Sequence, residues 1–97
     1  MTKVFDNAEL LIKSIVAVKN EEECKTFLED LMTANEIIDL SQRILVAKLL
    51  KEKKSYVDIG AETGASTATI SRVNRCLAYG NGGYDMILDK IESDKKQ

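Results

Sequence analysis

The sequence predicts an all-α protein built from about six helices. Apolar residues recur at spacings of three and four along most of the chain, which is the period of a helix with one buried face. The 97 residues contain no Pro, and 44% of them are hydrophobic although only 5% are aromatic. Packed helices with a core of Leu, Ile, Val and Ala account for this composition. The length predicts one domain over residues 1–97.

Capping signals divide the first half of the chain into three helices. Asn20 with Glu23, and Thr33 with Glu36, have the spacing of a capping box, in which a polar side chain accepts a free backbone N–H of the new helix. The third helix is long, at about five turns. The three predicted helices cover about residues 6–19, 21–32 and 33–53.

Residues 55–77, SYVDIGAETGASTATISRVNRCL, have the pattern of a helix-turn-helix. Gly64 supplies the positive φ that a tight turn between two helices needs, and Gly60 supplies a small residue where they touch. Ser66 or Thr67 is placed to cap the second helix. The side chains expected to face the core are Val57, Ile59 and Ala61 from the first helix and Ile70, Val73 and Leu77 from the second. Three glycines then precede a last helix over about residues 84–93.

The outer face of the second helix of this motif predicts binding to double-stranded DNA. Small and hydroxyl side chains at its N-terminus allow close approach to a groove, and its two arginines suit phosphates or guanine edges. Lys51, Lys53 and Lys54 precede the motif, where they could meet flanking phosphates. The predicted DNA-contacting residues are Lys53, Lys54, Ser66, Thr67, Ala68, Thr69, Ser71, Arg72 and Arg75. The alternative is an ordinary helical corner that contains Gly, Ser and Thr.

The distribution of charge agrees with this location, although the net charge of the chain is −2. Residues 41–80 hold seven Lys or Arg against three acids, whereas residues 1–40 hold four Lys against nine acids. The basic part of the chain is therefore the part that contains the motif, and the net charge does not exclude a nucleic-acid partner. For each single lysine, a solvated helix end stabilised by the helix dipole is the alternative.

Other classes of function find little support. The chain has no His, no metal-spaced Cys or His set and no Gly-rich phosphate loop, so we predict no enzyme, no metal and no cofactor. Cys24 and Cys76 are expected to be reduced and buried. Nothing resembles a signal peptide or a membrane-spanning segment, which predicts a soluble cytoplasmic protein without a membrane partner.

The apolar faces of the first and third helices predict a homodimer. They offer more hydrophobic surface than one small subunit covers, and a dimer would place two recognition helices about one DNA turn apart. A compact monomer is the alternative. The apolar residues that carry this prediction are Leu10, Leu11, Ile15, Ile37, Ile44 and Leu50.

The stretch LMTANEIIDLSQRILVAKLLKEKKS and the motif after it resemble the Trp repressor-like family, and within it the Trp repressor-related YerC/YecD group. The similarity covers about residues 28–80 and is strongest in GASTATISR. It implies an intertwined homodimer whose first three helices interlock across the twofold axis and whose reading heads project from it. It also implies water-mediated base contacts from Thr67, Ala68 and Thr69, with Ser71 replacing a Thr of the family.

The resemblance further implies the remnant of a tryptophan pocket. The two arginines that sandwich the ligand's indole in the repressor match Arg43 and Arg72, and the Thr that opens its long helix matches Thr33. A Gly of that pocket is Val73 here, and a Ser that helps to hold the ligand's amino group is Cys76. We expect Val73 to fill part of the pocket, so that tryptophan binding is lost and no small-molecule effector is assigned.

The alternative is a function of a different class. The protein would then be a helical interaction module, such as an adaptor or an antitoxin-like subunit, whose Arg43, Arg72 and Arg75 bind an acidic protein partner. Steep salt dependence with sequence preference would identify DNA, whereas shallow salt dependence without a preference for duplex would identify the interaction module.

Overall fold

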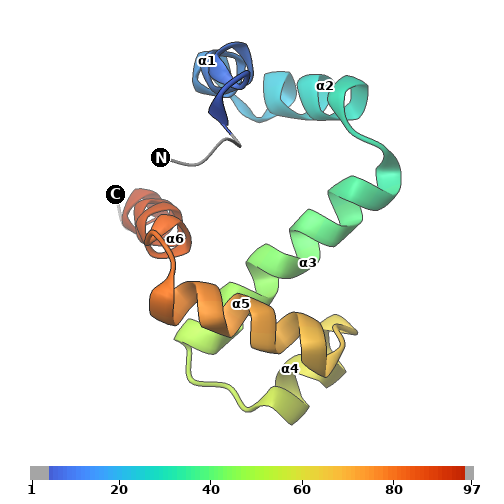
Figure 1. Ribbon diagram of the computed structural model, residues 1–97, viewed down its shortest axis with the longest axis vertical. Helices are drawn as coiled ribbons and strands as arrows, with labels where there is room; N and C mark the ends of the chain where they lie inside the picture. Colours follow the sequence, from blue (N-terminus) through green and yellow to red (C-terminus); the bar gives the residue numbers. More distant parts are fainter. Residues whose placement is uncertain (1–4, 96–97) are drawn as a thin grey trace. The chain divides into compact units, whose positions relative to one another are not determined.

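The computed structural model describes residues 5–95, and within this range every regular element is a helix (Figure 1). The six helices are α1 (Glu9–Ala17), α2 (Glu21–Leu31), α3 (Ala34–Lys51), α4 (Tyr56–Thr63), α5 (Thr67–Tyr79) and α6 (Gly83–Lys95). The predicted all-α class and helix count are therefore confirmed. The chain forms two compact units that divide between Ala34 and Asn35.

The N-terminal unit contains α1 and α2. Asn20 caps α2, because its side chain accepts the Glu23 N–H at 2.9 Å, and the Glu23 carboxylate accepts the Lys19 N–H at 3.0 Å. The first helix begins at Glu9, three residues later than predicted, because the preceding residues form a turn closed by the Ala8 N–H and the Phe5 carbonyl. Neither helix contains a buried residue.

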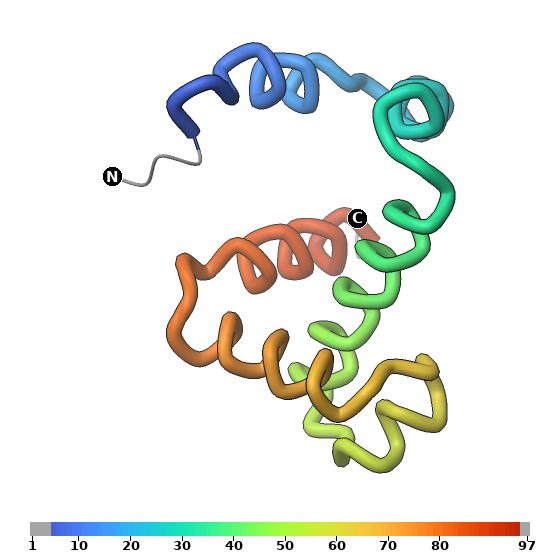
Figure 2. The backbone as a smooth tube through the Cα atoms, turned by 45° about the vertical axis from the view of Figure 1, so that its right-hand side comes forward, coloured from blue at the N-terminus to red at the C-terminus, as the bar shows by residue number. Residues whose placement is uncertain are grey.

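The C-terminal unit has an apolar core to which three helices and one turn contribute. Figure 2 shows the chain reversing direction between α5 and α6, and Leu50, Leu77, Tyr84 and Leu88 pack around the core as partly buried side chains. The buried core residues, all at most 8% exposed, are Val46, Ala47 and Leu49 of α3, Ile59 of α4, Ala65 of the following turn, and Ile70 and Val73 of α5.

The third helix ends at Lys51 because the chain adopts a left-handed turn two residues later. Lys53 has φ = 66°, its N–H donates to the Leu50 carbonyl at 3.0 Å, and the Lys54 N–H donates to the Leu49 carbonyl at 3.1 Å. This pair of hydrogen bonds is a Schellman motif, which usually places Gly at the left-handed position. A lysine there gives no sequence signal, so the predicted end at residue 53 was two residues too late.

Two predictions about burial are wrong. Val57 is 81% exposed and Ala61 is also exposed, whereas Ile59 is fully buried. Residues two apart in a helix lie on opposite sides of it, so these three could not share one buried face. Cys76 is exposed and Cys24 is half-buried, although both are free thiols as expected.

In the described part of the chain, no helix combines the length and the apolar character needed to cross a membrane.

Candidate nucleic-acid interface

The two helices of the predicted motif are α4 and α5, joined by the turn of residues 64–66. Ser55 caps α4 by accepting the Asp58 N–H at 3.1 Å. The helix ends at Gly64, whose φ of 74° is left-handed, and a Cβ added there would meet nothing within 4 Å. Glycine is therefore favoured at this position by backbone conformation and not by space. A Cβ on Gly60 would be in ordinary contact, 3.7 Å from the Ala65 carbonyl oxygen, so the small residue expected there is not required by a close approach.

A hydrogen-bond network holds the turn between α4 and α5. The Thr63 hydroxyl donates to the Ile59 carbonyl at 2.7 Å and accepts the Ala65 N–H at 3.1 Å. The side-chain amide of Gln42, on α3, donates to the Thr63 carbonyl at 3.2 Å. Neither Gln42 nor Thr63 was predicted from the sequence to have a role, because no local pattern pairs two residues 21 positions apart.

The start of α5 is capped by Ser66, one of the two residues predicted for this role. Its hydroxyl accepts the Thr69 N–H and donates to the Thr69 hydroxyl, both at 3.1 Å. Thr67 and Ala68 are exposed in the first turn, while Thr69 and Ser71 are half-buried. The helix contains no acidic residue. Its first turn thus presents backbone N–H groups and small side chains without a competing carboxylate.

The cations predicted to meet DNA share two properties. They are exposed, and none of them forms an ion pair with a carboxylate of residues 5–95. Their charge is therefore available to an external anion. These cations are Lys53, Lys54, Arg72 and Arg75.

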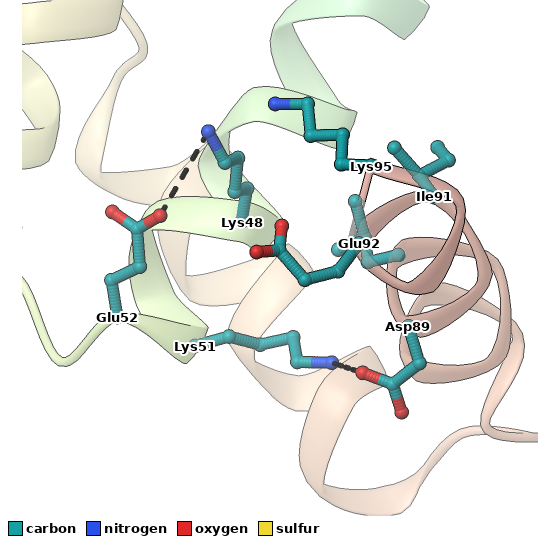
Figure 3. Close-up of a pocket in the computed structure, with 8 residues that line it drawn as sticks. Lys48, Lys51, Glu52, Asp89, Ile91, Glu92 and Lys95 are labelled. Carbon is teal, nitrogen blue, oxygen red and sulfur yellow. Dashed lines mark hydrogen bonds and ion pairs between the residues drawn. The ribbon is translucent and has the colours of Figure 1, made fainter. Parts of the chain in front are cut away.

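The lysines that face α6 differ from this group. Lys51 lies 3.0 Å from carboxylate oxygens of both Asp85 and Asp89, and Lys48 lies 3.8 Å from Glu52. Figure 3 shows Lys48, Lys51, Glu52 and Asp89 around a hollow of about 440 Å³ between α3 and α6. The hydrogen bonds that Lys51 donates to Asp85, the larger cause, and to Asp89 raise its pKa above the ordinary 10.5. Asp85 and Asp89 therefore compete for Lys51 with the flanking phosphates that the sequence predicted for it.

The residues of the predicted pocket remnant occupy different environments. Val73 is 2% exposed within the core, whereas Arg43, Arg72 and Cys76 are exposed. A second hollow, of about 460 Å³, is lined by Cys76, by Ile44 and by residues of the α5–α6 turn and α6, but neither it nor the first hollow is lined by Arg43 or Arg72. Thr33 belongs to the N-terminal unit.

Comparison with known proteins identifies the family to which this fold belongs. The family model described as Trp repressor protein matches residues 6–92. The chain is 52% identical over 87 residues to the uncharacterized protein YerC of Bacillus subtilis, covering 90% of this chain and 84% of that one. The crystal structure of a TrpR-like protein from Eubacterium eligens is similar with a TM-score of 0.86 and 50% identity, covering 90% of each chain. That of a candidate Trp repressor from Staphylococcus aureus has a TM-score of 0.84 and 48% identity, covering 95% of this chain and 89% of that one.

The matches identify an all-helical fold of the kind found in Trp repressor-like proteins. The chain belongs to the Trp repressor protein family, and its similarity to YerC places it in the YerC group of that family. The resemblance stated from the residues is thus confirmed.

Proposed function

We propose that the protein is a sequence-specific DNA-binding transcriptional regulator of the repressor type, in which α4 and α5 form a helix-turn-helix and α5 reads duplex DNA. The observation that carries this proposal is the exposed, acid-free start of α5, followed by Arg72 and Arg75, which form no ion pair with any of residues 5–95. Membership of the Trp repressor family supports it.

Each part of this surface has a role in the proposal. The small side chains of Thr67 and Ala68 let the helix N-terminus approach base edges, where Thr69 and Ser71 add hydroxyl groups. Arg72 and Arg75 bind phosphates or guanine, and the lysines at the end of α3 bind flanking phosphates. The exposed Schellman turn presents those two lysines side by side, immediately before the cap of α4.

A homodimer is part of this proposal. Several apolar side chains of α1 and α3 are largely exposed in the single chain, among them Leu10 at 75%, Val16 at 77% and Ile38 at 62%. Burying them against a second copy would remove apolar surface from water. Twofold symmetry would then place two α5 helices to read two half-sites one DNA turn apart.

The proposed regulator does not depend on tryptophan. The family's ligand pocket has Gly at the position of Val73, and here that side chain is 2% exposed among core residues. Closely packed neighbours cannot retreat to admit an indole ring without cost. Hydrogen bonding at the polar end of the pocket is weaker as well, because Cys76 carries a thiol where the family has a serine hydroxyl.

Selection of binding sites from a random duplex pool tests the DNA-binding part. The enriched site should bind the Arg72→Ala/Arg75→Ala variant more weakly, with a salt slope reduced by about two units if both residues meet phosphates. Lys90→Ala/Lys95→Ala removes the same charge from α6 and is the control that should retain binding. No enrichment of any duplex, or equal binding by the arginine variant, would show that α5 does not read DNA. Binding to an acidic protein without duplex preference would instead support the interaction module.

Calorimetry tests independence from tryptophan. We expect no heat of binding at millimolar tryptophan and no change in affinity for the selected duplex when it is added. A micromolar affinity, or a tenfold gain in DNA binding, would contradict the filled pocket.

A further inference from the structure

Gln42 connects the long helix α3 to the turn that precedes α5. Its side-chain amide donates to the carbonyl oxygen of Thr63, the last residue of α4, across 3.2 Å, and the contact is partly buried. The last carbonyls of a helix have no partner within that helix. Gln42 therefore satisfies a group that would otherwise need water in a partly enclosed place.

Thr63 extends this contact toward α5. Its hydroxyl binds back to the Ile59 carbonyl and also accepts the N–H of Ala65, which is 8% exposed. Ala65 directly precedes Ser66, the cap of α5. A chain of hydrogen bonds thus leads from α3 to the residue before the cap of the proposed recognition helix.

The surrounding core does not provide the same constraint. Ile59, Ile70 and Val73 meet α3 through apolar surfaces, and apolar attraction has no preferred direction. A hydrogen bond weakens steeply as its angle departs from linear, so it resists rotation of one helix over another. The Gln42 contact therefore adds a directional constraint that apolar packing lacks.

We propose that Gln42, acting through Thr63, is a positioning residue for DNA recognition: it holds the first turn of α5 in one orientation relative to α3. This inference rests on the proposed DNA-binding function. Loss of the contact lowers the fraction of molecules whose α5 is aligned for binding, and the apparent affinity falls by the same factor. The net contribution of one hydrogen bond corresponds to a change of about fivefold.

The test uses Gln42→Met in the full chain, which keeps the length of the side chain but removes the donor. The expected result is an affinity for the selected duplex about fivefold lower, with the salt slope and the binding of unrelated duplex unchanged, because no phosphate contact is removed. Thr63→Val should have a similar effect, whereas Thr63→Ser keeps the hydroxyl and should restore the affinity of the parent.

Leu88→Ala is the matched control, because Leu88 packs against the core from α6 and takes no part in the hydrogen bonds of the network. It should lower the thermal midpoint at least as much as Gln42→Met while keeping the affinity for the selected duplex. The positioning role is overturned if Gln42→Met binds that duplex like the parent, or if both variants lose affinity in proportion to their loss of stability.

Amide hydrogen exchange separates this inference from the proposed function. In Gln42→Met the amides of Ala65 and Thr69 should exchange faster, while the Val46 amide in α3 keeps its rate. If the parent binds no duplex, the proposed function is wrong and the positioning of DNA recognition is wrong with it. If the parent binds DNA but the exchange of these amides is unchanged, only the positioning role fails.

Discussion

The two compact units of this protein differ in how they bury apolar surface. In the C-terminal unit seven described residues are at most 8% exposed, and they come from three helices and the turn between two of them. In the N-terminal unit neither helix contains a buried residue, although α1 has the sequence ELLIKSIVA. The C-terminal unit can therefore be explained by contacts within a single chain. The N-terminal unit instead presents an apolar helix that a single chain leaves exposed to water.

The core of the C-terminal unit should give the largest loss of stability. Ile59→Ala removes a fully buried side chain from a cluster that has few other members, and we expect a loss of about 3 kcal/mol in the free energy of unfolding. Urea titration measures this loss. Val57→Ala, on the same helix but at 81% exposure, is the control and should change stability by less than about 0.5 kcal/mol. Equal effects of the two changes would mean that α4 packs differently.

A charge on α1 should act on assembly. Ile15 is 55% exposed in the single chain, and Ile15→Lys would place an ammonium group in the proposed dimer contact at a cost of about 2 kcal/mol per subunit. Light scattering should show a dimer for the parent at micromolar concentration and a lower mass for the variant. Asn7→Lys introduces the same charge at an exposed polar position and should leave the mass unchanged. A monomeric mass for the parent would show that the exposed apolar face of α1 is not a dimer contact.

A smaller effect is expected at the end of α3, where the C-terminal unit stores local strain. Lys53 is the non-glycine residue with positive φ at the Schellman turn, so Lys53→Gly should stabilise the protein by about 1 kcal/mol. The thermal midpoint should rise, while the proposed DNA binding should weaken because one cation is lost. Lys54→Gly removes the same charge without relieving a positive φ, and it should not raise the midpoint. A rise in both variants would indicate that charge repulsion, not strain, is relieved.

Local interactions were predictable from the sequence, because the residues involved lie within four positions of one another. The caps at Asn20 and Ser66 and the left-handed Gly64 were all predicted, and the structure contains each of them. The helix ends that were missed, such as that of α3, lacked a typical glycine or capping residue.

Interactions that depend on how helices cross could not be predicted from the sequence. Gln42 and Thr63 are 21 positions apart, and Lys51 meets Asp89 at a separation of 38. The sequence around each of these residues does not identify its partner. For the same reason Lys51 was grouped with Lys53 and Lys54, although the structure pairs it with α6.

The smallest predicted effect concerns this pairing and its dependence on pH. Hydrogen bonds to Asp85 and Asp89 raise the pKa of Lys51 above 10.5, the ordinary value that applies to the unfolded chain. The folded protein therefore holds this proton more tightly, so the stabilisation is complete below pH 10.5 and is lost as the pH rises through the higher folded value. Thermal midpoints of the parent and Lys51→Met should differ slightly at pH 8 and converge above pH 10.5. The difference at pH 8 should also shrink in high salt, because the pair is partly exposed.

Lys90→Met is the matched control on α6, since Lys90 forms no ion pair with any of residues 5–95, and its midpoint should follow that of the parent at every pH. A gap between parent and Lys51→Met that stays constant as the pH rises past 10.5 would mean that Lys51 stabilises α6 through packing of its hydrocarbon chain and not through its charge.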